Sequence, residues 1–431
     1  MKTAAFYTLG CKVNQYETEA VAELFSDAGY TVVPFTDKAD CYIINTCSVT
    51  SMSDRKSRQM IRRARKTNPS ALIAVMGCYS QTAPDEVLKI DGVNLVLGTK
   101  EKGSVVRLIE NLSNTDKLNA VTDVRDSHTY EDLKIKRCPG HTRAYIKIQD
   151  GCSQFCSYCI IPYARGPVRS RKEDEIINEI SSLADAGYKE VILTGIHAAS
   201  YGTDLGDTSL EQLLNKLEDI DGIERIRLSS IEPMTLNRSF VEKIKNCKKL
   251  CPHFHISLQS GCNETLKRMN RHYTTEQFAD VVEGLREAFP DCAITTDIMV
   301  GFAGETDEEF NKTLEFIKNI AFADAHVFQY SQRRGTPAAR RPDQVNPEIK
   351  EARSKAVIEE TTRSHNEFLQ RHIGRIMRVL IETRAKDGLY EGKTSNYITV
   401  KTSSDTDICG QFKKILLEKE ESGIIFGKTV D

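Results

Sequence analysis

Short β-rich runs alternate with amphipathic helical patterns along most of the chain, and this alternation restricts the fold more than any other feature. Near the N-terminus the strand candidates are AAFYTLG, CYIINT, LIAVMG and NLVLG. Helical patterns near residues 14–28, 53–66 and 103–110 accompany them. Such alternation is typical of a parallel sheet covered by helices. We therefore predict an N-terminal parallel α/β domain over residues 1–112.

A second series of β/α units follows after a polar, weakly patterned segment at residues 111–140, which we interpret as a linker. Its strand candidates are RAYIKIQ, KEVILTG, RIRLSS, HFHISL, AITTDIMVG and AHVFQY. Helical patterns such as EDEIINEISSLADAG separate most of them. Six units of this kind favour a partial (β/α)6 barrel. We place this central domain at residues 138–368.

The last part of the chain changes character after a helical stretch near residues 347–371. IMRVLIE, YEGKTSNYITVK, CGQFKKILLEKE and GIIFGKT resemble short antiparallel strands. A small β-barrel over residues 371–431 fits this pattern. The predicted fold class is therefore α/β, with a small β-barrel at the C-terminal end.

Composition and charge restrict the kinds of partner, the cellular compartment and the chemistry that we expect for this chain. The 59 basic and 61 acidic residues give a net charge of −2, so nucleic acid binding requires a local basic patch. No signal peptide and no apolar run long enough for a membrane helix is visible, which predicts a cytoplasmic protein without membrane contact. The chain has 13 cysteines. Because the cytosol keeps thiols reduced, metal or redox chemistry is favoured over disulfides.

Three cysteines lie within the stretch GCSQFCSYC, directly after the first predicted barrel strand. In barrels of this type the loops that follow the strands build the active site. Cys152, Cys156 and Cys159 can therefore place three thiolates on one metal centre, leaving one position open for a substrate. The alternative is a structural zinc site with Cys138 or His141 as the fourth ligand.

This cysteine spacing resembles the signature of the radical S-adenosylmethionine superfamily. The resemblance implies a [4Fe–4S] cluster whose open iron binds S-adenosylmethionine. Polar residues at the ends of the later strands fit such a cofactor shell, although each is by itself an ordinary loop residue. The candidate cofactor-binding residues are Tyr158, Thr194, Gly195, Ser230, Glu232, Gln259, Asp297 and Gly301.

Three further cysteines are distant in sequence but share one position relative to the predicted strands. Cys11, Cys47 and Cys78 each follow a strand of the N-terminal domain, in YTLGC, IINTC and VMGC. Since the carboxyl ends of parallel strands share one sheet edge, we expect these thiols to meet there. Cys41 begins its strand and should lie at the opposite edge. The alternative is three unrelated buried thiols.

With this second trio the whole chain resembles the radical methylthiotransferases. The matching blocks are LGCKVNQYETE, GCSQFCSYCIIPYARGPVRSR, ISLQSGCNETLKRMNRHYT and DIMVGFAGETDEEF. LGCKVNQYET with RGPVRSR most resembles the bacterial branch that methylthiolates carbon-2 of threonylcarbamoyladenosine beside the tRNA anticodon. Sister branches modify isopentenyladenosine in tRNA or an aspartate of a ribosomal protein. A non-enzymatic alternative is a zinc-stabilised RNA-binding protein.

The resemblance also implies cofactors and partners. The family uses two [4Fe–4S] clusters and S-adenosylmethionine, and the second cluster, here on Cys11, Cys47 and Cys78, carries the sulfur to be donated. An external electron donor of the flavodoxin or ferredoxin type and a sulfur donor are required. The expected substrate is the anticodon loop of a tRNA, and the last domain resembles the family's RNA-binding domain, known as TRAM.

Candidate RNA contacts lie in two segments. RKSRQMIRRARK, with Arg55, Arg58 and Arg62, follows Cys47 and suits phosphate contacts, although a solvated helix face is the common alternative. KTSNYITVK supplies Lys393 and Tyr397, and Tyr397 is as compatible with packing.

Near the fourth barrel strand, LKRMNRHYT offers three further candidates for the substrate. Arg271, with Arg268 and His272, suits the carboxylate of the threonylcarbamoyl group. The alternative for Arg268 is an ordinary ion pair.

Overall fold

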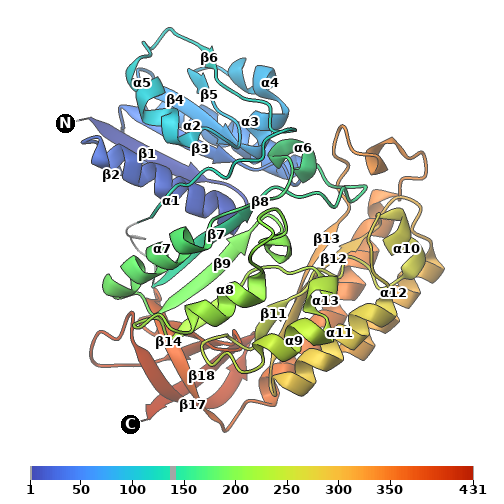
Figure 1. The fold of residues 1–431 in the computed structure, drawn as a ribbon. Coiled ribbons are helices and arrows are strands. Elements are labelled where there is room, and N and C mark those ends of the chain that lie inside the picture. Colours follow the sequence, from blue (N-terminus) through green and yellow to red (C-terminus); the bar gives the residue numbers. More distant parts are fainter. Residues whose placement is uncertain (1, 136–141, 431) are drawn as a thin grey trace.

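Three groups of strands follow one another along the chain in the computed structural model, which describes residues 2–135 and 142–430. Figure 1 shows the N-terminal α/β domain, the curved central sheet with its outer helices, and the C-terminal barrel below them. The α/β fold class is therefore confirmed.

The N-terminal sheet has the order β2-β1-β3-β4-β5-β6, and all its neighbours pair in parallel. Its strands are β1 Thr3–Thr8, β2 Thr31–Val33, β3 Cys41–Thr46, β4 Leu72–Gly77, β5 Leu95–Val96 and β6 Leu118–Asn119. The helices are α1 Lys12–Asp27, α2 Ser51–Thr67, α3 Cys78–Thr82, α4 Pro84–Leu88 and α5 Val105–Glu110, with a short 3₁₀ turn, η1, at Lys102–Ser104. Strand β6 lies inside the predicted linker, so part of that segment belongs to this sheet.

The central domain contains the six predicted strands as one parallel arc. They are β7 Arg143–Asp150, β9 Glu190–Gly195, β10 Arg225–Leu228, β11 His253–His255, β12 Ala293–Val300 and β13 Asp324–Gln329. β7, β9 and β10 form one parallel set and β11, β12 and β13 another, joined by the bridges Ile226↔Leu250 and Ile231↔Ile256. A short strand, β8 Arg169–Ser170, adds antiparallel to β7.

Helices cover the outer face of this arc. They are α7 Glu173–Asp185, α8 Leu210–Leu217, α9 Arg238–Ile244, α10 Asn263–Arg268, α11 Thr275–Ala288, α12 Asp307–Ile320 and α13 Pro347–Gln370, with 3₁₀ turns η2 Ala198–Ser200 and η3 Pro233–Leu236. The short helix α6 Ile161–Arg165 instead packs against α3 of the N-terminal domain, and the 3₁₀ turn η4 Ala338–Arg340 lies in the loop after β13. Alternate strand residues such as Ile146, Ile226 and Phe254 pack outward against them in one large core. The intervening strand residues face the interior of the barrel.

The C-terminal strands close into a barrel in the order β14-β15-β16-β18-β17. They are β14 Ile376–Arg384, β15 Tyr390–Thr394, β16 Thr399–Thr402, β17 Phe412–Glu421 and β18 Ile424–Val430. The expectation of purely antiparallel strands was wrong at one seam, because β16 and β18 pair in parallel. The hydrogen bonds across this seam complete the ring.

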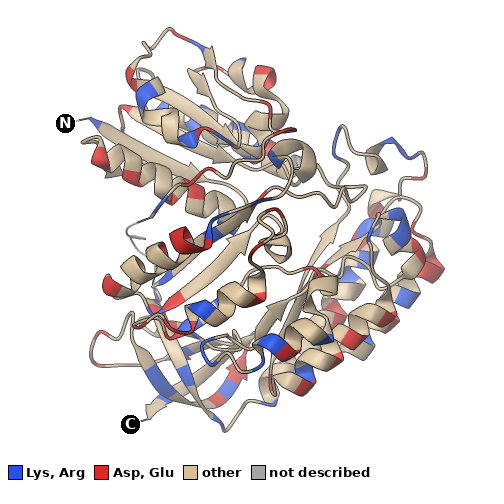
Figure 2. Ribbon diagram, viewed as in Figure 1, with Lys and Arg blue, Asp and Glu red and all other residues tan. Residues whose placement is uncertain are grey.

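Basic and acidic side chains are interspersed on the outer helices α11 and α12 (Figure 2). This arrangement agrees with the near-zero net charge of −2. No helix within the described residues is both long and apolar enough to cross a membrane.

Candidate active site

The loop after β7 brings its three cysteines close together. Gly151 turns the chain at φ +76°, where a side chain would collide with the carbonyl of Pro167 at 1.8 Å, so only glycine fits. The N–H of Cys152 donates to the Gly166 carbonyl at 3.0 Å, and the N–H of Cys159 donates to the Cys156 carbonyl at 2.9 Å. The loop therefore holds its thiols at the carboxyl end of the barrel.

These thiols lie in a low-dielectric surrounding with one nearby cation. Burial raises the pKa of Cys152 to about 11 and that of Cys159 to about 12. The guanidinium of Arg271 lies 3.4 Å from the sulfur of Cys156. Thiolates at this position therefore need a bound metal group to compensate their charge.

The second trio follows three neighbouring strands of the N-terminal sheet, as predicted. Cys11, Cys47 and Cys78 come after β1, β3 and β4, which are adjacent in the sheet order. A side chain at Gly10 would lie 2.9 Å from the sulfur of Cys47. Burial raises the pKa of Cys47 and raises that of Cys78 to about 12, and a negative charge on Cys11 adds to both shifts, which indicates that the three thiols lie near one another.

The arrangement of the cysteines in both trios suits a metal cluster better than a single metal ion. Within residues 2–135 and 142–430, no set of three His, Cys, Asp or Glu side chains closes around a single metal-ion position. Three thiols spread around one space match the donors of an iron–sulfur cluster. Cys138 and His141, the suggested fourth zinc ligands, lie outside the described residues.

Several predicted cofactor residues surround the first trio. Gln149 organises this region, because its amide N–H groups donate to the carbonyls of Asp150 and Gly151 at 2.7 Å, while its oxygen accepts from the His197 N–H at 2.8 Å. Gly195 has no room for a side chain, which would lie 2.9 Å from that oxygen. Thr194 is buried beside it at the end of β9.

Glu232 and Gln259 are also held at the barrel mouth. Glu232 lies 3.6 Å from Arg271, and its buried Oε1 accepts no hydrogen bond from a described residue. Gln259 adopts φ +65° and pairs with β12 through Ile298. This oxygen has an ion-pair partner in Arg271 but no hydrogen bond, so it can still accept one from a polar ligand beside the thiols.

A cavity of about 410 Å³ opens between the two cysteine sites. Cys159 and Tyr158 line it on one side, and Val49 and Thr50, which follow Cys47, line it on the other. Asp297 forms part of its wall from β12. The cavity therefore connects the loops of both trios with the barrel interior.

Other predicted site residues lie in different surroundings. Ser230 is exposed and bonds Ser257 at 2.8 Å. A side chain at Gly301 would meet Lys350 at 2.3 Å, so this glycine serves packing against α13. Arg268 pairs with Glu309, the ordinary alternative considered for it.

The structure places Arg271 beside the first thiol trio, and its contact with a substrate carboxylate stays a prediction. Its side chain is only 8% exposed and is directed at Cys156 and Glu232. The guanidinium therefore belongs to the neighbourhood of the first thiol trio.

The predicted RNA-contact residues divide into two groups. Arg55 and Arg62 are exposed on α2, which begins beside Cys47, whereas Arg58 is held by the hydroxyl of Tyr79 at 3.0 Å. Tyr397 stacks on His253 with ring centroids 4.5 Å apart, and Lys393 lies 4.3 Å from the Tyr397 ring. Of the two interpretations kept for Tyr397, this geometry favours packing between the C-terminal barrel and the central one.

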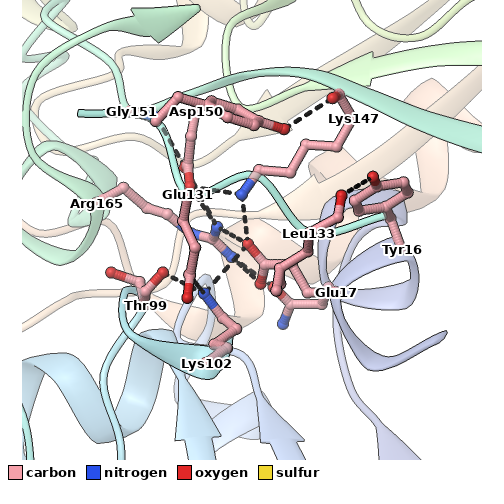
Figure 3. Close-up of polar contacts among 12 residues, drawn as sticks. Tyr16, Glu17, Thr99, Lys102, Glu131, Leu133, Lys147, Asp150, Gly151 and Arg165 are labelled. Carbon is pink, nitrogen blue, oxygen red and sulfur yellow. Dashed lines mark hydrogen bonds and ion pairs between the residues drawn. The ribbon is translucent and has the colours of Figure 1, made fainter. Parts of the chain in front are cut away.

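A buried ionic cluster between the two cysteine sites was not predicted (Figure 3). Glu17 of α1 is fully buried and contacts Arg165 at 2.6 Å, Lys147 at 2.7 Å and Lys102 at 3.4 Å. Asp150 contacts Lys147 at 2.7 Å and Arg165 at 3.2 Å. The sequence carried a signal, because Glu17 lies on the apolar face of its helix with Val13, Tyr16, Ala20 and Val21.

Arg333 is a second residue that the sequence analysis missed. It donates to the hydroxyl of Ser48 and to Asp54, both at 2.7 Å. The loop after Cys47 is thereby tied to the loop after β13. No sequence pattern indicates a contact over this separation.

Comparisons with known proteins agree with this architecture. Residues 146–317 match the family described as the radical SAM superfamily, and residues 3–98 match the one described as uncharacterized protein family UPF0004. Among solved structures, the radical S-adenosylmethionine methyltransferase TsrM of Kitasatospora setae superposes with a TM-score of 0.58 at 16% identity, over 79% of this chain and 77% of that one, which shows the fold alone.

Curated relatives match over nearly the full length. The threonylcarbamoyladenosine tRNA methylthiotransferase MtaB of Bacillus subtilis (strain 168) is 43% identical over 97% of this chain and 94% of its own. The Thermotoga maritima protein of the same name is 39% identical over 99% and 96%. The tRNA-2-methylthio-N(6)-dimethylallyladenosine synthase of Acetivibrio thermocellus is 34% identical over 98% and 90%.

Proposed function

Since the chain belongs to the radical SAM methylthiotransferases, we propose that it adds a methylthio group to carbon-2 of N6-threonylcarbamoyladenosine beside the tRNA anticodon. The observation that carries the proposal is the cavity lined by Cys159 of one trio and by Val49 and Thr50, which follow Cys47 of the other trio in a different domain. The higher identity to relatives named for threonylcarbamoyladenosine, 38–43% against 34–37% for the dimethylallyladenosine synthases, favours this substrate.

Each trio has its own task in this proposal. Cys152, Cys156 and Cys159 would hold a [4Fe–4S] cluster that binds S-adenosylmethionine, and Cys11, Cys47 and Cys78, which are likewise free thiols, would hold a second one. When bound, these groups supply a radical that can break an unactivated aromatic C–H bond and the sulfur that replaces the hydrogen.

The protein's own side chains position these groups and keep water away. Gln149 fixes the loop of Cys152, and Arg271 offsets negative charge at Cys156. Arg333 holds the loop after Cys47 against the loop after β13 of the barrel. Holding the reacting groups in one water-poor space is the main contribution of the chain.

Further assignments belong to the same proposal. The domain boundaries 1–112, 138–368 and 371–431, the cytoplasmic location, the electron donor of flavodoxin or ferredoxin type and the sulfur donor belong to this proposal, with the N-terminal domain extended to include β6. Arg55 and Arg62 on the exposed face of α2 are the favoured phosphate contacts for the anticodon arm.

Nucleoside mass spectrometry of tRNA from cells with and without the gene tests the substrate. We expect the 2-methylthio form of threonylcarbamoyladenosine to disappear in the deletion strain. Loss of 2-methylthio-isopentenyladenosine would instead favour the sister tRNA branch. Unchanged tRNA together with an unmodified ribosomal protein would favour the aspartate branch.

Metal analysis tests the two cluster sites. The anaerobically reconstituted protein should hold two clusters, about eight irons, and replacing either trio by alanine should halve the iron. Zinc with little iron would support the non-enzymatic alternative. Replacing Cys41 and Cys251 by alanine is the matched control and should leave the iron content unchanged, because Cys41 lies at the other sheet edge.

A further inference from the structure

An open hollow of about 680 Å³ adjoins the cavity between the two cysteine sites. Ile160, the residue after Cys159, lines both spaces, so they meet there. The walls of the hollow come from α2, α3 and α4 of the N-terminal domain, from α6, which lies beside α3 in Figure 1, and from the loop after β13. Its volume lies within the range of about 300–1,000 Å³ that is typical of ligand sites. A ligand that occupies the cavity can therefore extend into the hollow.

Two exposed aromatic rings lie next to each other at this hollow. Tyr163 of α6 lines the hollow and is 46% exposed. Phe155 of the cysteine loop is 52% exposed and contacts Tyr163 edge to face, with ring centroids 5.9 Å apart. Large aromatic rings are mostly buried in a folded chain, so a contiguous exposed pair beside a hollow indicates a partner that covers it.

The backbone of the cysteine loop keeps the Phe155 ring outside the core. Phe155 adopts φ +47°, a left-handed conformation that is unfavourable for a bulky residue. Its carbonyl oxygen accepts a hydrogen bond from the side-chain amide of Asn270 at 3.0 Å, which holds this conformation. The exposure of the ring is therefore a fixed property of the loop.

The charged side chains of the hollow leave one cation over. Asp54 pairs with Arg333 at 2.7 Å, and Glu86 lies 3.5 Å from Arg58. Arg334 also lines the hollow and is exposed, and it makes neither a hydrogen bond nor an ion pair with residues 2–135 or 142–430. The hollow therefore offers a free guanidinium to an anion, and phosphate is an anion that arginine binds well.

A nucleotide of single-stranded RNA matches both features of the hollow. Its base has a flat face that stacks on an aromatic side chain, and its phosphate pairs with a guanidinium. The loop of an anticodon arm presents such nucleotides on both sides of the modified adenosine. Because the cavity and the hollow meet at Ile160, neighbouring nucleotides can occupy them together.

We infer that the hollow is a second nucleotide site, in which a direct neighbour of the modified adenosine stacks on Tyr163 and places its phosphate at Arg334. The inference rests on the proposed function and deepens it, because it names a second part of the RNA that this site binds. Phe155 supports the ring of Tyr163 from its edge. Binding of the neighbour holds the loop open and so keeps the target base in the cavity.

Binding of RNAs that lack one base tests the stacking contact. The probes are an anticodon stem-loop carrying threonylcarbamoyladenosine and two versions of it, each abasic at one neighbour of that nucleotide. For the reconstituted wild-type protein we expect one abasic RNA to bind about 10-fold more weakly than the intact RNA, the size of one base–aromatic stack. Tyr163→Ala should bind the intact RNA and this abasic RNA alike. Tyr163→Phe keeps the ring and should keep the wild-type difference.

The salt dependence of binding tests the phosphate contact. Arg334→Gln should reduce the slope of log affinity against log salt by about one and leave the discrimination against the abasic RNA unchanged. Lys318→Gln is the matched control, because Lys318 is an exposed cation near the end of α12 that leads into β13, at the opposite end of the barrel strands from the cysteine loops. This control should change neither the slope nor the discrimination.

Three results overturn the inference. They are a wild type that binds both abasic RNAs as it binds the intact one, a Tyr163→Ala variant that keeps the discrimination, and an Arg334→Gln variant with an unchanged salt slope. A wild type that binds none of the three RNAs overturns it as well. Failure of the proposed function appears separately, as an unchanged content of the 2-methylthio form of threonylcarbamoyladenosine in tRNA of the deletion strain.

Discussion

Replacing Glu17 by glutamine should destabilise the protein by about 3 kcal/mol, because it removes the central charge of the cluster in Figure 3. Lys102, Lys147 and Arg165 would then share Asp150 and the more distant Glu131 as their acidic neighbours. The cations lower the pKa of Glu17 from 4.5 to about 2, against the opposing effect of burial. Such a change on folding corresponds to about 3 kcal/mol at neutral pH.

The lowered pKa of Glu17 also determines how the free energy of unfolding depends on pH. Because the folded pKa of Glu17 is depressed, its stabilising effect is fully present above pH 4.5 and is lost as the pH falls toward 2. The difference in unfolding free energy between wild type and Glu17→Gln should therefore be constant near neutrality. It should shrink through this acidic window.

Urea unfolding followed by far-ultraviolet circular dichroism is a suitable assay, since the chain has no tryptophan. Glu110→Gln is the matched control, because the ion pair of Glu110 with Lys2 at 4.0 Å is exposed, and the substitution should change stability by less than about 0.5 kcal/mol. A loss below about 1 kcal/mol for Glu17→Gln, or one equal to the control, would refute the reasoning.

Three further predictions concern single contacts. Arg271→Gln should slow reductive cleavage of S-adenosylmethionine even without RNA, because the guanidinium beside Cys156 is lost; an unchanged cleavage rate would contradict this role. Arg333→Ala should leave that cleavage intact but lower methylthiolation several-fold, measured as product per cleavage, since the loop after Cys47 loses its tie. Tyr397→Ala should lower the unfolding free energy by about 3 kcal/mol or more, through loss of packing on His253, and leave anticodon stem-loop affinity unchanged; a selective loss of affinity would restore its RNA role.

The sequence predicts those features that depend on local pattern. The six barrel strands and the position of each thiol trio follow from short apolar runs and from what comes directly after them. The carboxyl ends of parallel strands lie at one edge of a sheet, and this rule was sufficient to place the thiols that follow β1, β3 and β4 at the same edge. Strands such as β6 and β8 have two residues each, so no periodicity marks them.

Contacts between side chains that are far apart in the sequence could not be predicted from local sequence pattern. The Glu17–Arg165 and Arg333–Asp54 pairs join segments whose relative position depends on domain packing. Arg271 was assigned to the substrate because a positive charge near the barrel mouth suits any anion there. Only the fold shows that a thiol is its nearest partner.

The first turns of α1 carry Cys11 and Glu17 on one rigid element. At 1.5 Å per residue these positions span only about 9 Å. Glu17 is also paired with Lys147 of β7 and Arg165 of α6, so the helix that begins beside Cys11 is held on the central domain by buried charges. The separation between the two cysteine sites is therefore set by how α1 seats on the barrel, and a change in this ion cluster would be felt at both sites.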